Sequence, residues 1–201
     1  MGSPQATRTN GGWHDRGMPT IADLAARIAL LEPSCGPARL VAVDGPGGSG
    51  KTTFAGLLSG ALDGAPVVHS DDFPIPWDQG PESWFSHLTR DVLEPLRSGA
   101  KASFLRYDWR RGVYAERVEV PPVAVVIVEG VSVARAECPA ALRVWVEVPR
   151  EVRQARVLAR DGAGHADDWV TWTAAEDAWF ARHPVTADAH VDGVTFEVVW
   201  P

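Results

Sequence analysis

The residues with the clearest chemical potential are the eight at positions 45–52, which read GPGGSGKT. They satisfy the pattern G-x-x-x-x-G-K-[ST], in which glycines let successive backbone N–H groups turn toward phosphate oxygens. In such a loop Lys51 reaches the β- and γ-phosphates and the Thr52 hydroxyl helps to hold Mg²⁺. The alternative is a glycine-rich turn that happens to precede Lys-Thr. We predict a nucleoside triphosphate site formed by Gly45, Gly47, Gly48, Ser49, Gly50, Lys51, Thr52 and Thr53.

Three carboxylates stand at the ends of two apolar runs. Asp71 and Asp72 follow the run in APVVHSDDF, and Glu129 closes VVIVEG. Asp71 is the candidate general base, because a carboxylate near an acceptor hydroxyl can take its proton during phosphoryl transfer. Glu129, with Thr52 and Asp71, is a candidate ligand of Mg²⁺, which prefers oxygen donors. The alternative for both aspartates is that they cap a loop in solvent.

The segment REVRQARVLARD carries several arginines at the spacing of an α-helix. Arg153, Arg156 and Arg160 are three and four residues apart and therefore share one helix face. Guanidinium groups match triphosphate oxygens, so this segment could act as a lid over the nucleotide. The alternative is a solvated basic stripe balanced by Glu151 and Asp161.

These residues need a framework that brings strand ends together. Buried-type strands are predicted at 39–45, 65–73, 121–130 and 142–149, with one or two more in 190–200. Helices are predicted at 20–33, 52–64, 81–99, 150–161 and 167–183. This alternation predicts a three-layer α/β fold with a mostly parallel five-stranded sheet and a short helical lid at about 150–168. Ligands of such folds bind beyond the carboxyl ends of the strands.

Composition limits the function classes. The chain has 201 residues, a formal charge of −7 and 45% hydrophobic residues, which suits one globular domain at 20–201. No run reaches the roughly 18 apolar residues of a membrane span. The net acidity argues against a nucleic-acid surface, so we expect a small-molecule partner and leave a homo-oligomer open.

The termini and cysteines indicate the compartment. Residues 1–19 are polar, lack the apolar core of a secretory signal, and are expected to form a flexible leader, with Met18 as an alternative start. Cys35 and Cys138 fit no metal-ligand spacing and are expected to be reduced thiols. We therefore predict a cytoplasmic protein.

Taken together, the chain resembles the uridine kinase-like branch of the P-loop NTPase kinases, which includes phosphoribulokinase and bacterial pantothenate kinase relatives. The shared segments are DGPGGSGKTT, SDDF, RYDW, VVIVEG and VRQARVLARD, in the family order over about residues 40–161. The resemblance implies Mg²⁺-dependent transfer of the ATP γ-phosphate to a hydroxyl group of a small molecule.

The resemblance also implies residue roles. Asp71 would be the base, with Asp72 beside it at the substrate, and Lys51 would bind ATP and act as a catalytic residue. Tyr107 and Asp108 would help to form the acceptor pocket. The lid arginines would be Arg156, as a catalytic residue, together with Arg153 and Arg160 at the nucleotide.

The acceptor is less clearly indicated than the nucleotide. Where uridine kinases have a tyrosine and an FDHP stretch that grips the ribose, this chain reads FPIPWDQGPESWF. Four aromatic residues could stack on a flat acceptor ring, or could instead close the core: Trp77, Trp84, Tyr107 and Trp109. A nucleoside-like acceptor is expected, with a sugar, a vitamin precursor or an antibiotic as alternatives.

Two other classes of nucleotide-binding protein fit the sequence less well than a kinase. A GTPase switch would need an Asn-Lys-x-Asp element, but the only asparagine of the chain is Asn10. A non-catalytic ATP-binding module would keep the loop and lack a second pocket. Asp71 and the Tyr107-Asp108 pair favour the kinase.

Overall fold

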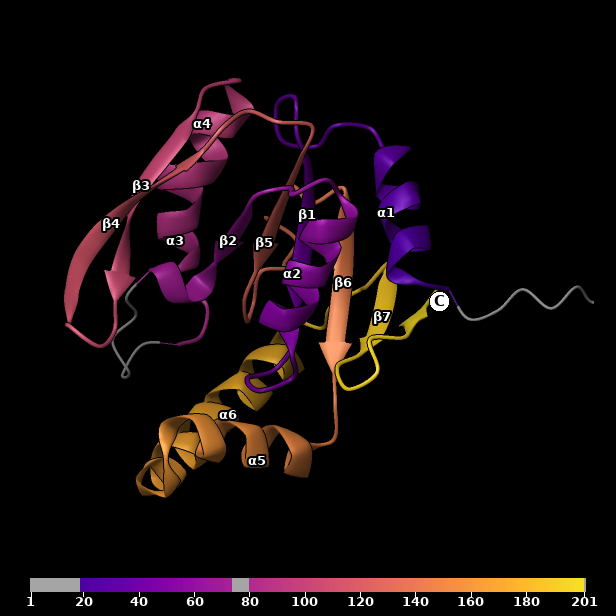
Figure 1. Cartoon of the computed structure of the whole chain (residues 1–201). Helices are drawn as coiled ribbons and strands as arrows, with labels where there is room; N and C mark the ends of the chain where they lie inside the picture. Colours follow the sequence, from indigo (N-terminus) through magenta and orange to yellow (C-terminus); the bar gives the residue numbers. More distant parts are fainter. Residues whose placement is uncertain (1–18, 74–79, 201) are drawn as a thin grey trace, which may run out of the picture.

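The computed structural model describes residues 19–73 and 80–200, and a six-stranded sheet of order β2-β5-β1-β6-β7-β8 runs through its centre (Figure 1). Its first five members in this order pair in parallel, and β8 pairs antiparallel with β7. The strands are β1 (Arg39–Asp44), β2 (Val67–His69), β5 (Val125–Glu129), β6 (Leu142–Glu147), β7 (Ala189–Asp192) and β8 (Val198–Val199). The sequence predicted five strands; the sixth arises because the terminal segment folds back on itself.

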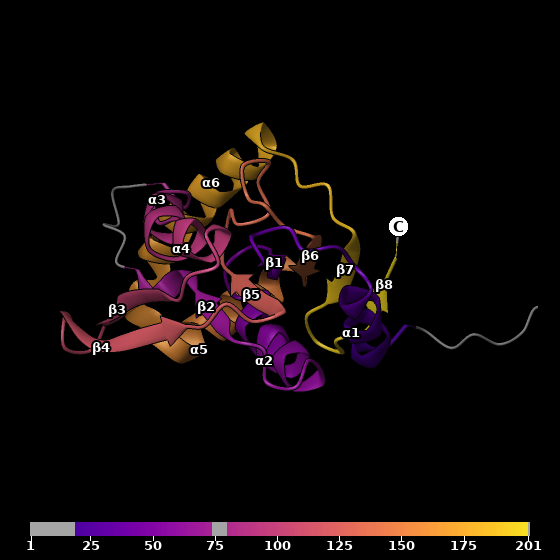
Figure 2. The same cartoon turned by 90° about the horizontal axis from the view of Figure 1, so that it is seen from above.

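Helices cover both faces of this sheet (Figure 2). Along β1, Val41 and Val43 face one buried cluster, while Leu40 and Ala42 face another, as the alternation of a strand requires. The first cluster includes side chains of α1 (Ile21–Ala29) and α2 (Lys51–Ala61). The second includes those of a helical segment formed by α3 (Phe85–Leu88), a π-helical turn η2 (Thr89–Leu93) and α4 (Glu94–Arg97). The predicted three-layer α/β fold is confirmed.

An antiparallel hairpin stands apart from the main sheet and was not predicted. It consists of β3 (Ala102–Asp108) and β4 (Val113–Val120). Ala102, Phe104 and Val120 are buried in the same cluster as α3 and α4, while most of β4 is exposed. Figure 1 shows the hairpin on the β2 side of the main sheet.

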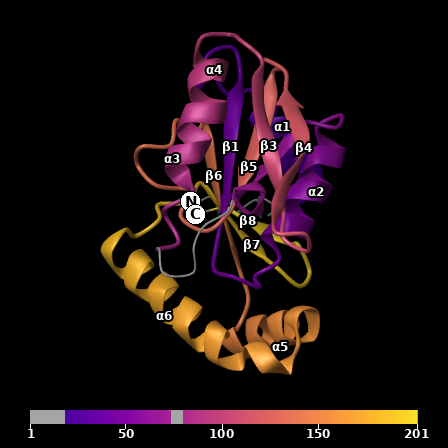
Figure 3. The same ribbon diagram turned by 90° about the vertical axis from the view of Figure 1, so that its left-hand side faces the viewer.

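Two helices cross the carboxyl end of the sheet. These are α5 (Arg150–Asp161) and α6 (Ala166–Arg182), joined by a 3₁₀ turn, η3 (Ala163–His165). Figures 1 and 3 show the pair beyond the end of β6, where the predicted lid was placed. None of the helices in the described part of the chain is long and apolar enough to cross a membrane.

Candidate active site

The phosphate loop (residues 45–52) connects β1 to α2 and has the backbone that its glycines were expected to permit. Gly45, Gly48 and Gly50 have φ angles of 147°, 77° and 105°, which side chains disfavour. Gly50 occupies the N-cap position of α2 and has no side chain to accept from the first N–H groups of the helix. Those donors and the helix dipole suit a bound anion. The loop therefore fits the phosphates of a nucleotide.

Lys51 begins α2 and is buried, and its Nζ donates a hydrogen bond of 3.0 Å to the carbonyl oxygen of Pro46. This bond folds the ammonium group back over the loop. Thr52 follows on the first turn, and Thr53 is exposed beside it. Ser49 is fully buried, and its Oγ has no hydrogen-bond partner within the described residues.

A cluster of three side chains joins α2 to the ends of β2 and β5. The Thr52 hydroxyl donates to Glu129 Oε1 at 3.1 Å, and His69 Nδ1 lies 2.8 Å from the same oxygen. Glu129 is 3% exposed, and its hydrogen bond raises the pKa of His69 above 6.5, against the opposing effect of burial. Hydroxyl and carboxylate oxygens are the kind of ligand that Mg²⁺ binds. Among the described residues, no group of three or more histidine, cysteine, aspartate or glutamate side chains is arranged to hold a metal ion.

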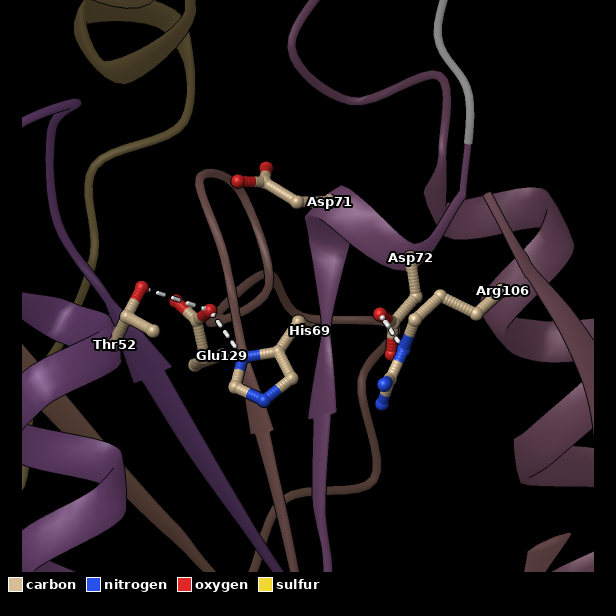
Figure 4. A pocket seen from close by; sticks show the side chains of 6 residues that line it. All are labelled: Thr52, His69, Asp71, Asp72, Arg106 and Glu129. Atoms are coloured by element: carbon tan, nitrogen blue, oxygen red, sulfur yellow. Dashed lines mark hydrogen bonds and ion pairs between the residues drawn. The ribbon is translucent and has the colours of Figure 1, made fainter. Parts of the chain in front are cut away.

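A pocket of about 320 Å³ opens beside this cluster (Figure 4). Asp71, on the 3₁₀ turn η1 (Ser70–Asp72), stands at its rim and is exposed, whereas Asp72 is buried and pairs with Arg106 at 2.8 Å. Partial desolvation, followed by the nearby charge of Glu129, raises the pKa of Asp71. The two adjacent aspartates therefore differ in their surroundings. The pocket lining is Thr52, His69, Asp71, Asp72, Arg106 and Glu129.

None of the predicted acceptor residues on the hairpin lines this pocket, but one of them contacts the backbone of Asp71 at its rim. Trp109 Nε1 donates to the backbone oxygen of Asp71 at 2.7 Å, which ties the hairpin to η1. The Tyr107 ring packs edge-on against Trp109 and against Tyr114, at centroid distances of 5.0 and 5.4 Å. The Asp108 carboxylate instead accepts backbone N–H groups of the hairpin turn, from residues 110 and 111.

Of the two remaining predicted aromatic residues, Trp84 does not line the pocket. Trp84 is 1% exposed and donates its indole N–H to the carbonyl oxygen of Val131, so it is part of the core rather than of an acceptor site. This placement corrects the prediction, and its cause is the packing of α3 against the sheet. Trp77 lies outside the described residues.

The three lid arginines differ from one another in their contacts. Arg156 donates to the carbonyl oxygens of Gly48 and Ser49 at 3.3 and 3.2 Å, so its guanidinium group lies on carbonyls rather than free for phosphates. Arg153 is 7% exposed and lies near Glu176. Arg160 pairs with Asp161, and its positive charge partly opposes the rise in the pKa of Asp71.

Three site residues were not singled out from the sequence. His69 is the last residue of β2 and stands two residues before Asp71, so its position at the strand end was a usable signal. Arg106 precedes the predicted Tyr107 and shares its strand. Glu176 is 129 residues from its partner Gly47, and no local pattern marks it.

Comparisons with known proteins show the fold. No family model matches the chain, and no curated protein matches it. A crystal structure of a provisionally assigned fructose transport system kinase from Silicibacter sp. TM1040 matches with a TM-score of 0.66 and 22% identity, over 86% of this chain and 98% of that one. A possible uridine kinase from Bacillus stearothermophilus matches with a TM-score of 0.57 and 19% identity, over 80% of this chain and 90% of that one. The chain therefore shares the α/β fold of these two structures.

Proposed function

We propose that the protein is an ATP-dependent kinase that transfers the γ-phosphate to a hydroxyl group of a small nucleoside-like acceptor. The observation that carries the proposal is the placement of Asp71 at the rim of a pocket that also contains the Thr52–Glu129 pair. A phosphate loop, a pair of oxygen donors and a separate carboxylate are the parts that phosphoryl transfer requires. The kinase names of both structural neighbours support the same reaction class.

Each residue has a role in this reaction. The phosphate loop and Lys51 orient the triphosphate, and Thr52 and Glu129 would hold Mg²⁺, which offsets negative charge on the phosphates. Asp71 accepts the proton of the acceptor hydroxyl as it attacks. Asp72 and Arg106, paired at 2.8 Å, provide an acceptor and donors for further hydroxyl groups. We extend the proposal to a cytoplasmic location, which the two free, buried cysteines support.

The nucleoside-like acceptor is supported by the aromatic residues of the hairpin. Trp109 and Tyr114 are 49% and 52% exposed, and Trp109 is bonded to the backbone of Asp71. A flat base could stack on these rings while its sugar hydroxyl meets Asp71.

A sugar or another polyol is the second candidate. The described residues that line the pocket are all polar or charged, and among them Asp72 has a buried Oδ2 without a hydrogen-bond partner in the described part of the chain. A free carboxylate oxygen of this kind suits an additional hydroxyl donor.

The experiment is an assay of ADP release from Mg-ATP with nucleosides, sugars, pantothenate-like alcohols and aminoglycosides, beside a no-acceptor reaction. Stimulation by nucleosides is expected, and Asp71→Asn should remove it. Stimulation by sugars alone would select the second candidate. Tight ATP binding without stimulation by any member of the panel would contradict the kinase and favour an ATP-binding module.

A further inference from the structure

We propose that Glu176 of α6 is a positioning residue for nucleotide binding, which holds the peptide between Pro46 and Gly47 from the side opposite Lys51. The inference rests on the proposed function, because it assigns a role at the same phosphate loop. Glu176 belongs to none of the motifs that carry the reaction.

Two oppositely charged side chains contact the same peptide unit, one at its C=O group and one at its N–H group. Lys51 Nζ donates to the Pro46 carbonyl oxygen at 3.0 Å, and the Gly47 N–H donates to Glu176 Oε1 at 2.7 Å. No peptide bond in the described residues is cis. In a trans peptide the C=O and N–H groups point in opposite directions. Since Lys51 lies on the phosphate side of the loop, Glu176 supports the loop from behind.

Glu176 is held in place by its surroundings. Its side chain is fully buried, Oε1 also accepts the Trp172 indole N–H at 2.6 Å, and Arg153 Nη1 lies 3.7 Å from Oε2. A buried carboxylate without such partners would be strongly destabilising. A Cβ at Gly47 would lie 3.0 Å from Glu176 Oε1 and 3.3 Å from Trp172 Nε1, so glycine permits this close approach.

Helix α5 supports the same side of the loop. A Cβ at Gly48 would lie 2.8 Å from the backbone oxygen of Arg153, and Arg156 donates to the carbonyls of Gly48 and Ser49. The carbonyl groups of Gly48 and Ser49 point toward Arg156. In a trans peptide the N–H group of the following residue then points away from α5. The α5–α6 pair therefore braces the phosphate loop, and Glu176 is its contact with a loop N–H group.

The test compares Glu176→Ala and Glu176→Gln with Asp177→Asn, an exposed neighbour on α6 that pairs with Arg150. Two measurements are made on each folded variant: the hydrogen-exchange rate of the Gly47 amide and the Kd of Mg-ADP by calorimetry. Glu176→Ala should lose Gly47 protection and bind Mg-ADP about tenfold more weakly, which corresponds to about 1.4 kcal/mol. Glu176→Gln retains an acceptor oxygen and should remain within about threefold of wild type. Asp177→Asn should match wild type.

Wild-type affinity and Gly47 protection in Glu176→Ala would overturn the inference. If that variant does not fold, Glu176→Asp, which withdraws the carboxylate by one methylene, takes its place with the same expected losses, and unchanged values would again overturn it. If the wild type binds no nucleotide, the proposed function fails. The Gly47 exchange rate then still decides whether Glu176 holds the loop.

Discussion

Thr52 and Glu129 are 77 residues apart in the sequence, and the hydroxyl of the first donates to the carboxylate of the second at 3.1 Å. The contact joins the first turn of α2 to the end of β5, and His69 at the end of β2 reaches the same carboxylate oxygen. Three elements that begin or end at the carboxyl edge of the sheet thus meet at one point. This convergence is the centre of the proposed kinase site.

Lys51→Ala should abolish phosphoryl transfer and weaken ATP binding. The substitution removes the ammonium group that lies over the phosphate loop and bonds to Pro46. ATP affinity is measured by calorimetry and transfer by ADP release. Lys101→Ala is the matched control, because Lys101 pairs with Glu119 on the exposed hairpin. Normal turnover by Lys51→Ala would refute the assignment of the loop.

Asp71→Asn should leave ATP affinity nearly unchanged and reduce turnover by about 10² to 10⁴. A base acts only when it is deprotonated, and desolvation with the charge of Glu129 raises the pKa of Asp71 above 3.8. The rate of the wild type should therefore fall as the pH falls through this raised pKa. This fall in rate is measured as the decrease of kcat/KM on the acidic side of its pH profile. Full turnover by the asparagine variant would show that Asp71 is not the base.

His69 should stabilise the fold more at low pH than at high pH. Its hydrogen bond to Glu129 raises its pKa in the folded state above the unfolded value of 6.5. The stabilisation is then fully present below pH 6.5 and is lost as the pH rises through the folded pKa. Melting temperatures of wild type and His69→Gln, measured from about pH 6 to pH 9, should converge at the alkaline end. A constant difference across that range would contradict this account.

Trp109→Phe should weaken use of the acceptor without changing the KM for ATP. The variant keeps an aromatic ring but loses the N–H group that donates to the Asp71 backbone at 2.7 Å. A single hydrogen bond is worth about 1 kcal/mol, so its loss should lower kcat/KM for the acceptor roughly fivefold. Trp145→Phe loses a comparable indole bond, to Glu147 at 2.9 Å, away from the pocket and serves as the control. Equal effects of both variants would argue against a specific role of Trp109.

The sequence predicted the framework better than it predicted the contacts. Apolar β-branched runs marked β1, β5 and β6 because parallel strands are buried on both faces. The hairpin was missed because β4 is exposed and intersperses Glu116, Arg117 and Glu119 among its apolar residues. The turn between β3 and β4 also lacks an Asn-Gly or Asp-Gly pair, which is the usual sequence mark of a tight hairpin.

Local motifs located the candidate site only in part. The phosphate loop, Asp71 and Glu129 each follow an apolar run, so sheet topology alone brings them to one edge. The pairing of Asp72 with Arg106 and of Gly47 with Glu176 depends on how the hairpin and α6 pack. Packing between distant segments leaves no fixed spacing in the sequence.

The most direct test of the kinase assignment is transfer of ³²P from [γ-³²P]ATP to the acceptor that stimulates ADP release. Wild type should form a labelled product in the presence of Mg²⁺, Asp71→Asn should form it at least about a hundredfold more slowly, and Lys51→Ala should form none. Labelled inorganic phosphate without a labelled acceptor, in the wild type at every acceptor concentration, would contradict the account.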